Sequence, residues 1–407
     1  MKIFDELKWR GLINDISSPD LEEKLNNEKM TFYIGTDPTA DSLHIGHYSS
    51  FLIAKRLKLA GHNPILLVGG ATGLIGDPKP NTERPMITHE ELDHNYKGLR
   101  AQVEKIFGFE VVNNYDWSKD INFIDYLRDY GKYFSINYML AKETVKARLE
   151  TGITYTEFSY MIMQSLDFLY LYEHNNCILQ LGGQDQWGNI ISGVELIRKK
   201  IGKTAYALTM PHILDENGRK IGKSEGNAVW LDKNRTSSYE LYQYFINTSD
   251  IVVIDFLKKL TFLTKEEIEE IEKSHIEKPE LHYAQQQLAK SVITDLHGDR
   301  SYDEALRISE ILFSGEVNKL NAKEIKEVFK DLPVFILKEE KNIIDVLVES
   351  EVCTSKREAR EFINCGTISI NGEKTKDLEY IISKAKAIDN EFIIIRRGKK
   401  KYYLLKF

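Results

Sequence analysis

Cysteine is scarce in this chain of 407 residues. Its three cysteines, Cys177, Cys353 and Cys365, are widely spaced, and no two of them form a C-x-x-C pair. Neither a disulfide framework nor a zinc ribbon is indicated, and three reduced thiols in a cytoplasmic protein are the simplest interpretation.

Long hydrophobic runs are also missing. No apolar stretch approaches the roughly 20 residues that a membrane-spanning helix needs. The charged stretch MKIFDELKWRGLINDISSPDLEEK contains no signal-peptide core, so we expect no secretion signal and no membrane partner. Hydrophobic residues at 42% and aromatic residues at 11% exclude general disorder and fit a globular chain of about two to four domains.

Charge is unevenly distributed along the chain. The whole sequence has 55 Lys and Arg against 62 Asp and Glu, a formal net charge of −7. Residues 341–407 have 14 basic and 10 acidic side chains, or +4, which leaves −11 for the rest. A basic segment on an acidic body indicates contact with a polyanion, although a modest basic excess is more often a solvated face.

Residues 31–230 alternate between short apolar strands and helical patterns. The predicted strands, each followed by turn-forming residues, are 31–34, 65–68, 110–112, 178–181 and 207–208. A helix is predicted over 43–59. This alternation predicts an α/β fold, a Rossmann-like parallel-sheet catalytic domain with helices on both faces and ligands at the carboxyl ends of the strands.

The rest of the chain predicts two further domains. Capping-box patterns at 264–267 and 321–324 predict helix starts, so a helical domain over 226–330 is expected after the catalytic domain over 1–225. Residues 331–340 are the predicted linker. Residues 341–407 combine two predicted helices with hairpins at 371–372 and 397–399, which predicts a small α+β domain.

The segment 38–47 (PTADSLHIGH) contains the first group of chemically active residues. It lies between a predicted strand and a predicted helix, whose first turn offers unpaired N–H groups to a phosphate. His44 and His47 share one face of that turn, and Gly46 leaves room for a flat nucleotide base. Zinc binding by the two histidines is the alternative, but no third ligand stands nearby.

The segment 220–224 (KIGKS) contains the second group. A P-loop would need a glycine at position 217, which is Asn. A glycine-rich loop with Lys220 and Lys223 fits better the task of closing over a triphosphate and neutralising charge as pyrophosphate leaves. An ordinary exposed basic turn remains the alternative for this pentapeptide taken alone.

Together the two segments resemble the HIGH and KMSKS signatures of class I aminoacyl-tRNA synthetases. Further segments are similar to those of bacterial-type tyrosyl-tRNA synthetases, and the similarity extends to Phe407. These segments are YIGTDPT (33–39), GGATGLIGDP (69–78), YMIMQSLDF (160–168), QLGGQDQWGN (180–189) and RRGKKKYYLLKF (396–407). Chance coincidence of all of them in order is remote.

The resemblance implies a tyrosine site and an ATP site. For tyrosine, Tyr33 and Asp167 would hold the phenol hydroxyl, Tyr160, Gln164 and Asp77 the ammonium group, and Gln186 would lie near the carboxylate. For ATP, the contacts would come from Gly35, Asp37, Gly183 and Asp185, with Gly46 under the base. The catalytic residues at the triphosphate would be Thr39, His44, His47, Lys220, Lys223 and Ser224.

These assignments agree with the chemistry of carboxylate activation. The substrate carboxylate attacks the α-phosphorus itself, so donors that align anions are needed instead of a side-chain nucleophile. Bound phenylalanine would leave Tyr33 and Asp167 unpaired, which is costly. One loop departs from the family: 79–84 (KPNTER) is one residue short, so the roles of Lys79 and Arg84 at the phosphates stay open.

The C-terminal segment resembles a small RNA-binding domain shared by these synthetases, a ribosomal small-subunit protein and some pseudouridine synthases. RNA contacts are expected from Lys356, Arg360, Arg396, Arg397, Lys399, Lys400 and Lys401. A merely solubilising role is the alternative, and the contrast of +4 against −11 favours RNA.

The implied function is that of a cytoplasmic tyrosine–tRNA ligase. It would use tyrosine, ATP with Mg²⁺ and tRNA(Tyr), act as a homodimer, and need no resident metal. Tyrosine would pass through an adenylate to the 3′-terminal ribose of the tRNA. The rivals are a tryptophan-specific relative, another nucleotidyltransferase with a HIGH motif, and an inactive RNA-binding protein that has kept the fold.

Overall fold

The computed structural model describes residues 1–79, 86–224, 227–398 and 401–407, apart from the side chains of residues 143, 223, 224 and 227. The chain forms two compact units. The first is Met1–Thr236 with Thr248–Leu296, and the second is Ser237–Asn247 with His297–Phe407. Within the described residues, no helix is both long and apolar enough to cross a membrane.

A six-stranded sheet organises the first unit, with the strand order β1-β6-β5-β2-β3-β4. Its strands are β1 (Asp15–Ile16), β2 (Thr31–Thr36), β3 (Asn63–Val68), β4 (Glu110–Asn113), β5 (Cys177–Gly183) and β6 (Tyr206–Met210). All neighbours pair in parallel except the edge strand β1, which is antiparallel to β6. The predicted α/β fold and its five predicted strands are confirmed; the short β1 was not predicted.

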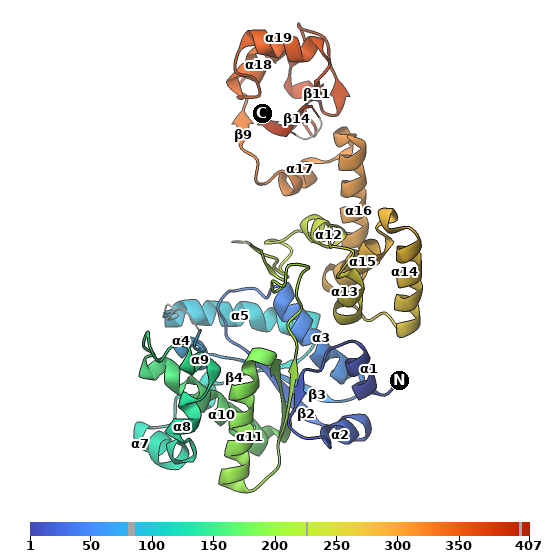
Figure 1. Cartoon of the computed structure of the whole chain (residues 1–407). Coiled ribbons are helices and arrows are strands. Elements are labelled where there is room, and N and C mark those ends of the chain that lie inside the picture. Colours follow the sequence, from blue (N-terminus) through green and yellow to red (C-terminus); the bar gives the residue numbers. More distant parts are fainter. Residues whose placement is uncertain (80–85, 225–226, 399–400) are drawn as a thin grey trace. The chain divides into compact units, whose positions relative to one another are not determined.

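The centre of this sheet is covered on both faces. Phe32, Tyr33 and Ile34 are consecutive in β2, point alternately to opposite faces, and are all buried. On the face of Tyr33, the core includes Phe168 of α10 (Tyr155–Asn175), which lies beside α11 (Trp187–Ile201) in Figure 1. The crossover between β2 and β5 opens the crevice where such folds bind ligands.

Two of the other helices of the first unit begin at caps that the local sequence predicts. The predicted helix 43–59 is α3 (Ile45–Leu59), capped by His44, and Thr264 with Glu267 forms the expected capping box. The set is α1 (Ile3–Trp9), α2 (Leu21–Asn27), α4 (Thr72–Ile75), α5 (His89–Ile106), α6 (Tyr115–Ser118), α7 (Phe123–Asp125), α8 (Ile136–Leu140), α9 (Glu143–Lys146), α13 (Val253–Leu260), α14 (Lys265–Glu277) and α15 (Tyr283–His297).

The second unit combines helices with a five-stranded sheet in the order β12-β11-β14-β15-β9. Its helices are α12 (Ser238–Ile246), α16 (Asp299–Ser314), α17 (Ala322–Val328), α18 (Ile343–Glu349) and α19 (Lys356–Asn364). Its strands are β9 (Val334–Ile336), β10 (Lys341–Asn342), β11 (Ile368–Ile370), β12 (Glu373–Lys374), β13 (Ile381–Ile382), β14 (Phe392–Arg397) and β15 (Lys401–Lys406).

Two local features of this unit were visible in the sequence. Asn371 and Gly372 both have positive φ, as a tight hairpin turn between β11 and β12 requires. β14 and β15 form the second predicted hairpin. The segment predicted as a linker, 331–340, contains β9, which pairs in parallel with β15.

Candidate active site

A cavity of about 370 Å³ opens at the carboxyl ends of β2 and β5. It brings together most of the residues predicted to bind tyrosine and ATP. These are Tyr33, Gly35, Asp37, Thr39, His44, His47, Asp77, Tyr160, Gln164, Asp167, Gly183 and Gln186. Among the predicted residues that the structure describes, Gly46, Asp185 and Lys220 are not part of its lining.

Asp167 is the buried carboxylate at one end of the cavity. Oδ1 accepts a hydrogen bond from Trp117 Nε1 and Oδ2 one from Asn114 Nδ2, both at 2.9 Å. Burial raises the pKa of Asp167 to about 7, although these two hydrogen bonds act in the opposite direction. Burial and the charge of Asp167 also raise the pKa of the Tyr33 phenol well above its ordinary value. This end can therefore recognise a hydroxyl group.

Asp37 lies at the end of β2 and ties two other segments to it. Its carboxylate accepts hydrogen bonds from Thr72 Oγ1 at 2.9 Å and from Tyr160 Oη at 3.0 Å. Burial, and then the charge of Asp37, raises the pKa of Tyr160 well above its ordinary value, so this phenol stays protonated. Asp37 thereby orients Tyr160 of α10 at the cavity wall.

Asp77 forms an acidic corner surrounded by carboxamides. Oδ2 accepts from Gln186 Nε2 at 2.7 Å, and Oδ1 from Asn189 Nδ2 at 3.2 Å. Asn189 Nδ2 also lies 3.2 Å from Gln164 Oε1. One carboxylate with neighbouring amide oxygens is a suitable environment for an ammonium group.

His44 and His47 form a reciprocal cap at the start of α3. His44 Nδ1 accepts from Gly46 N at 3.1 Å, and His47 Nδ1 accepts from His44 N at 3.2 Å. Their ring centroids are 3.9 Å apart. A neutral imidazole whose Nδ1 accepts has its proton on Nε2, so both rings can donate to an anion. The predicted pairing of the two histidines on one face is confirmed.

The KIGKS segment lies against the start of α3. A β-carbon on Gly222 would come 2.8 Å from Gly46 N, and Ile221 O lies 3.4 Å from where a β-carbon of Gly46 would be. β7 (Lys223–Ser224) pairs antiparallel with β8 (Asn227–Ala228), so this segment is not the strand-to-helix turn of a P-loop. The side chains of Lys223 and Ser224 lie outside the described residues.

Lys220 and Asp185 are side by side next to the cavity. Lys220 Nζ lies 3.7 Å from Asp185 Oδ2, and His212 Nε2 lies 3.4 Å from Oδ1. Burial lowers the pKa of His212, whereas the charge of Asp185 raises it. A β-carbon on Gly183 would meet Asp185 Oδ1 at 2.6 Å, so glycine is needed for this close approach.

The structure adds site residues that the sequence did not single out. Asn114 and Trp117 hold Asp167, Thr72 holds Asp37, and Asn189 holds Asp77. The position of Asn114 directly after β4 was the available signal, because the carboxyl ends of parallel strands meet at one edge of the sheet. Lys79 also lines the cavity, whereas Arg84 lies outside the described residues.

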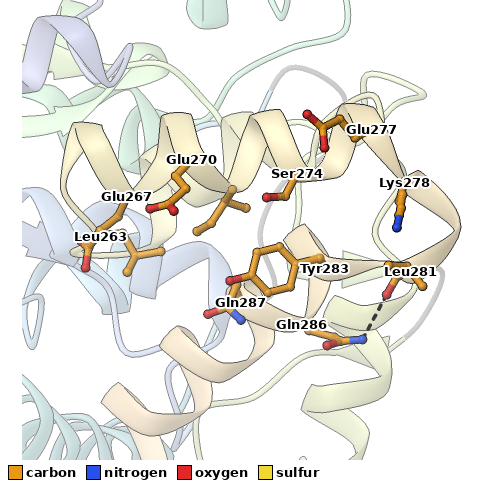
Figure 2. A pocket seen from close by; sticks show the side chains of 11 residues that line it. Leu263, Glu267, Glu270, Ser274, Glu277, Lys278, Leu281, Tyr283, Gln286 and Gln287 are labelled. Carbon is orange, nitrogen blue, oxygen red and sulfur yellow. Dashed lines mark hydrogen bonds between the residues drawn. The ribbon is translucent and has the colours of Figure 1, made fainter.

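A second hollow of about 670 Å³ lies between α14 and α15 (Figure 2). Its lining includes Glu267, Glu270 and Glu277 of α14 and, on the other side, Tyr283 and Gln286. None of the predicted site residues lines it, and three carboxylates would repel a triphosphate. It is larger than the first cavity but lacks the chemistry for the implied reaction.

The predicted RNA-binding residues fall into three groups. Lys356 and Arg360 are exposed on α19, and Lys401 is exposed at the start of β15. Arg396 and Arg397 are only half-exposed, and Arg397 Nη1 donates to Val352 O, which gives it a structural contact. Lys399 and Lys400 lie outside the described residues.

Comparisons with known proteins give the family. The family described as tRNA synthetases class I (W and Y) matches residues 25–314, and the tyrosine–tRNA ligase SYY-like C-terminal domain matches residues 324–405. The tyrosine–tRNA ligase of Staphylococcus carnosus is 50% identical over 416 residues, covering 100% of this chain and 99% of its own. The chain belongs to the tyrosine–tRNA ligase family. The tyrosine–tRNA ligase of Staphylococcus haemolyticus is 49% identical over 415 residues, which cover 100% of this chain and 99% of its own.

Solved structures of the tyrosine–tRNA ligase family agree with this result. A C-terminally truncated mitochondrial tyrosyl-tRNA synthetase of Aspergillus nidulans is 30% identical, has a TM-score of 0.69, and covers 77% of this chain and 94% of its own. A tryptophanyl-tRNA synthetase of Encephalitozoon cuniculi, 15% identical with a TM-score of 0.55, covers 74% of this chain and 87% of its own. That likeness shows the fold alone, so the comparisons favour tyrosine over the rival tryptophan interpretation.

Proposed function

We propose that the 370 Å³ cavity is where this member of the tyrosine–tRNA ligase family converts tyrosine and ATP, with Mg²⁺ bound to the phosphates, into tyrosyl-adenylate and pyrophosphate. The observation that carries the proposal is the pairing of two ends in one cavity. Tyr33 and Asp167 line this cavity and form one end of the proposed tyrosine site, and Asp77 with its carboxamides forms the other.

The two ends match the two polar ends of tyrosine. The phenol hydroxyl lies between Tyr33 and Asp167, and the ammonium group lies among Asp77, Tyr160 and Gln164. Gln186 donates to Asp77 and lies where the substrate carboxylate is expected. The substrate hydroxyl gives the buried Tyr33 and Asp167 a hydrogen-bond partner. Phenylalanine lacks the hydroxyl and would leave them unpaired, which disfavours its binding.

ATP is proposed to lie over the start of α3. Gly46 leaves room for the base, with Gly35, Asp37, Gly183 and Asp185 at the adenosine part. The donors at the triphosphate are Thr39, His44, His47, Lys220, Lys223 and Ser224. A helix N-terminus with neutral histidine donors and lysines stabilises the charge that develops on pyrophosphate.

The chemical step is a displacement at phosphorus. The tyrosine carboxylate oxygen attacks the α-phosphorus, the bond to the bridging oxygen breaks, and pyrophosphate leaves with that electron pair. The second step moves the tyrosyl group to the 3′-terminal ribose of tRNA(Tyr) and releases AMP. Since this reaction feeds translation, the proposed location is the cytoplasm.

The second unit is proposed to bind the tRNA. Lys356, Arg360 and Lys401 are the exposed basic residues that support this role. Lys399 and Lys400, which lie outside the described residues, are further proposed contacts, as are Arg396 and Arg397, which are only half-exposed.

The first unit is proposed to form a homodimer. Large apolar side chains are exposed along residues 123–155, which include α7, α8, α9 and the start of α10. They are Phe123, Ile124, Leu127, Ile136, Leu149 and Tyr155, with exposed fractions from 44% to 68%. An exposed apolar patch of this kind is typical of a protein interface, and a second copy of the chain is its proposed occupant.

Amino-acid-dependent ATP–pyrophosphate exchange tests the function. All twenty amino acids are assayed with Mg²⁺, and exchange is expected with tyrosine alone, followed by charging of tRNA(Tyr). Exchange driven by tryptophan would favour the rival substrate. Folded protein without any exchange would favour the inactive RNA-binding protein.

A further inference from the structure

Arg148 is a buried arginine that joins three separate segments near the Asp77 end of the cavity. Its side chain is 8% exposed. Nε donates to Gly152 O at 3.0 Å, Nη1 to Lys79 O at 3.0 Å, and Nη2 to Glu157 Oε2 at 3.2 Å. The guanidinium donors form a rigid fork, so three acceptors in three directions fix its position.

A gain in stability does not by itself explain why Arg148 and Glu157 form a buried ion pair. The Glu157 side chain is 2% exposed, and its Oε1 has no hydrogen-bond partner within the described part of the chain. A buried, partly satisfied ion pair is seldom more stable than an apolar pair of the same volume. The pair is better explained by the contact that it supports. Arg148 also donates to the carbonyl of Lys79, which is distant in the chain.

Lys79 connects this pair to the active site. It follows Asp77 by two residues, and the intervening Pro78 has a restricted φ. Lys79 lines the 370 Å³ cavity and, together with Thr39, an adjoining hollow of about 390 Å³. The Lys79 carbonyl is thus fixed two residues after Asp77 of the proposed ammonium site, at a residue that lines the same two cavities as Thr39 of the proposed phosphate site.

We propose that Arg148 is a positioning residue for ATP, which holds the Lys79 carbonyl and thereby directs the Lys79 ammonium group toward the triphosphate. The proposal rests on the proposed function. Asp77 is held separately by Gln186 and Asn189, so tyrosine binding does not depend on Arg148.

Three variants, R148K, K79A and the double variant, test the proposal. Each is assayed by tyrosine-dependent ATP–pyrophosphate exchange and by equilibrium dialysis with tyrosine. A lysine cannot reach three acceptors, so R148K is expected to raise the KM for ATP about tenfold and to change the Kd for tyrosine less than about twofold. K79A should act in the same direction, and R148K should add little to it, because both changes remove one contact.

Two matched variants separate positioning from general stability. E157Q keeps an oxygen acceptor for Nη2, so the KM for ATP should rise less than about threefold. R198K alters an arginine that is 62% exposed and pairs with Glu195 on α11, and it should leave both constants unchanged.

Three results would overturn the proposal: equal losses of ATP and tyrosine binding in R148K, additive effects in the double variant, or failure of R148K to fold. Each of these results would show that Arg148 contributes to the stability of the fold and does not position Lys79 for ATP. Absence of tyrosine-dependent exchange in the unaltered chain would instead refute the proposed function, and the inference with it.

Discussion

Gly222 lies against Gly46, so the KIGKS and HIGH segments meet backbone to backbone. A β-carbon on Gly222 would be 2.8 Å from Gly46 N, and Gly222 has a φ of +88°. Two backbone hydrogen bonds close to this contact also join the two regions of the chain: Ile45 N donates to Val229 O, and Leu231 N donates to Leu43 O. The loop that is proposed to handle pyrophosphate is therefore attached to the helix start that is proposed to hold the triphosphate.

G222A is expected to slow adenylate formation about tenfold or more, because the added methyl group pushes the two segments apart and the positive φ adds strain. The Kd for tyrosine should not change, since Tyr33 and Asp167 lie elsewhere in the cavity. Single-turnover kinetics and equilibrium dialysis measure the two effects. G218A is the control: Gly218 has a φ of +76°, but a β-carbon there would meet nothing within 4 Å. Equal effects of both variants would refute the role of the contact.

Y33F is expected to weaken the preference for tyrosine over phenylalanine by about tenfold in kcat/KM for exchange. The Tyr33 hydroxyl is buried and has no hydrogen-bond partner within the described residues, so its loss relieves the penalty that phenylalanine would meet. Y206F, which removes a hydroxyl that donates to Asp20 in the same unit, should leave the preference intact. An unchanged preference in Y33F would contradict its assignment to the phenol end.

Asp167 predicts a pH dependence of stability. Its pKa is raised by burial from 3.8 to about 7, so the folded state holds this proton more tightly than the unfolded state. The stabilising contribution is complete below pH ~4 and is lost as the pH rises to about 7. Between pH 5 and 7.5, the unliganded chain should lose roughly 2 kcal/mol more of its unfolding free energy than D167N does. Urea unfolding at both pH values measures this difference; parallel losses would show that Asp167 does not titrate there.

Y155D is expected to convert the proposed homodimer into a monomer, because a carboxylate replaces an aromatic side chain that is 63% exposed on the apolar patch. Sedimentation velocity at micromolar concentration measures the mass. I251D, at an apolar residue that is 83% exposed outside this patch, should leave the mass unchanged. A monomeric unaltered chain, or a dimeric Y155D, would refute the proposed interface.

The double variant K356E/R360E is expected to lower the affinity for tRNA(Tyr) at least tenfold and to flatten its dependence on salt concentration, since both residues are exposed on α19. Exchange without tRNA should be unaffected. Filter binding at two salt concentrations measures the first effect. The charge-matched reversal K8E/K29E, at exposed lysines of the first unit, serves as control. Equal losses in both variants would indicate a general charge effect.

Short-range features were largely predictable from the sequence. The five predicted strands, the caps at Thr264 and Asn321, and the Asn371-Gly372 turn all depend on residues that are close together in the chain. The family followed from ordered motifs along the whole length. The presence of Tyr33, Asp77 and Gln164 in one cavity followed from the resemblance of those motifs to the family, which implied that all three bind tyrosine.

The sequence by itself thus determined the fold class, the family and most of the residues that line the cavity. Only the tertiary structure decided how those residues are held. The bonds from Asn114 and Trp117 to Asp167, the approach of Gly222 to Gly46, and the bond from Arg148 to the Lys79 carbonyl each join segments that are distant in the chain. Burial, hydrogen-bond direction and the pKa of Asp167 depend on which segments surround a group in space, and no local pattern contains that information.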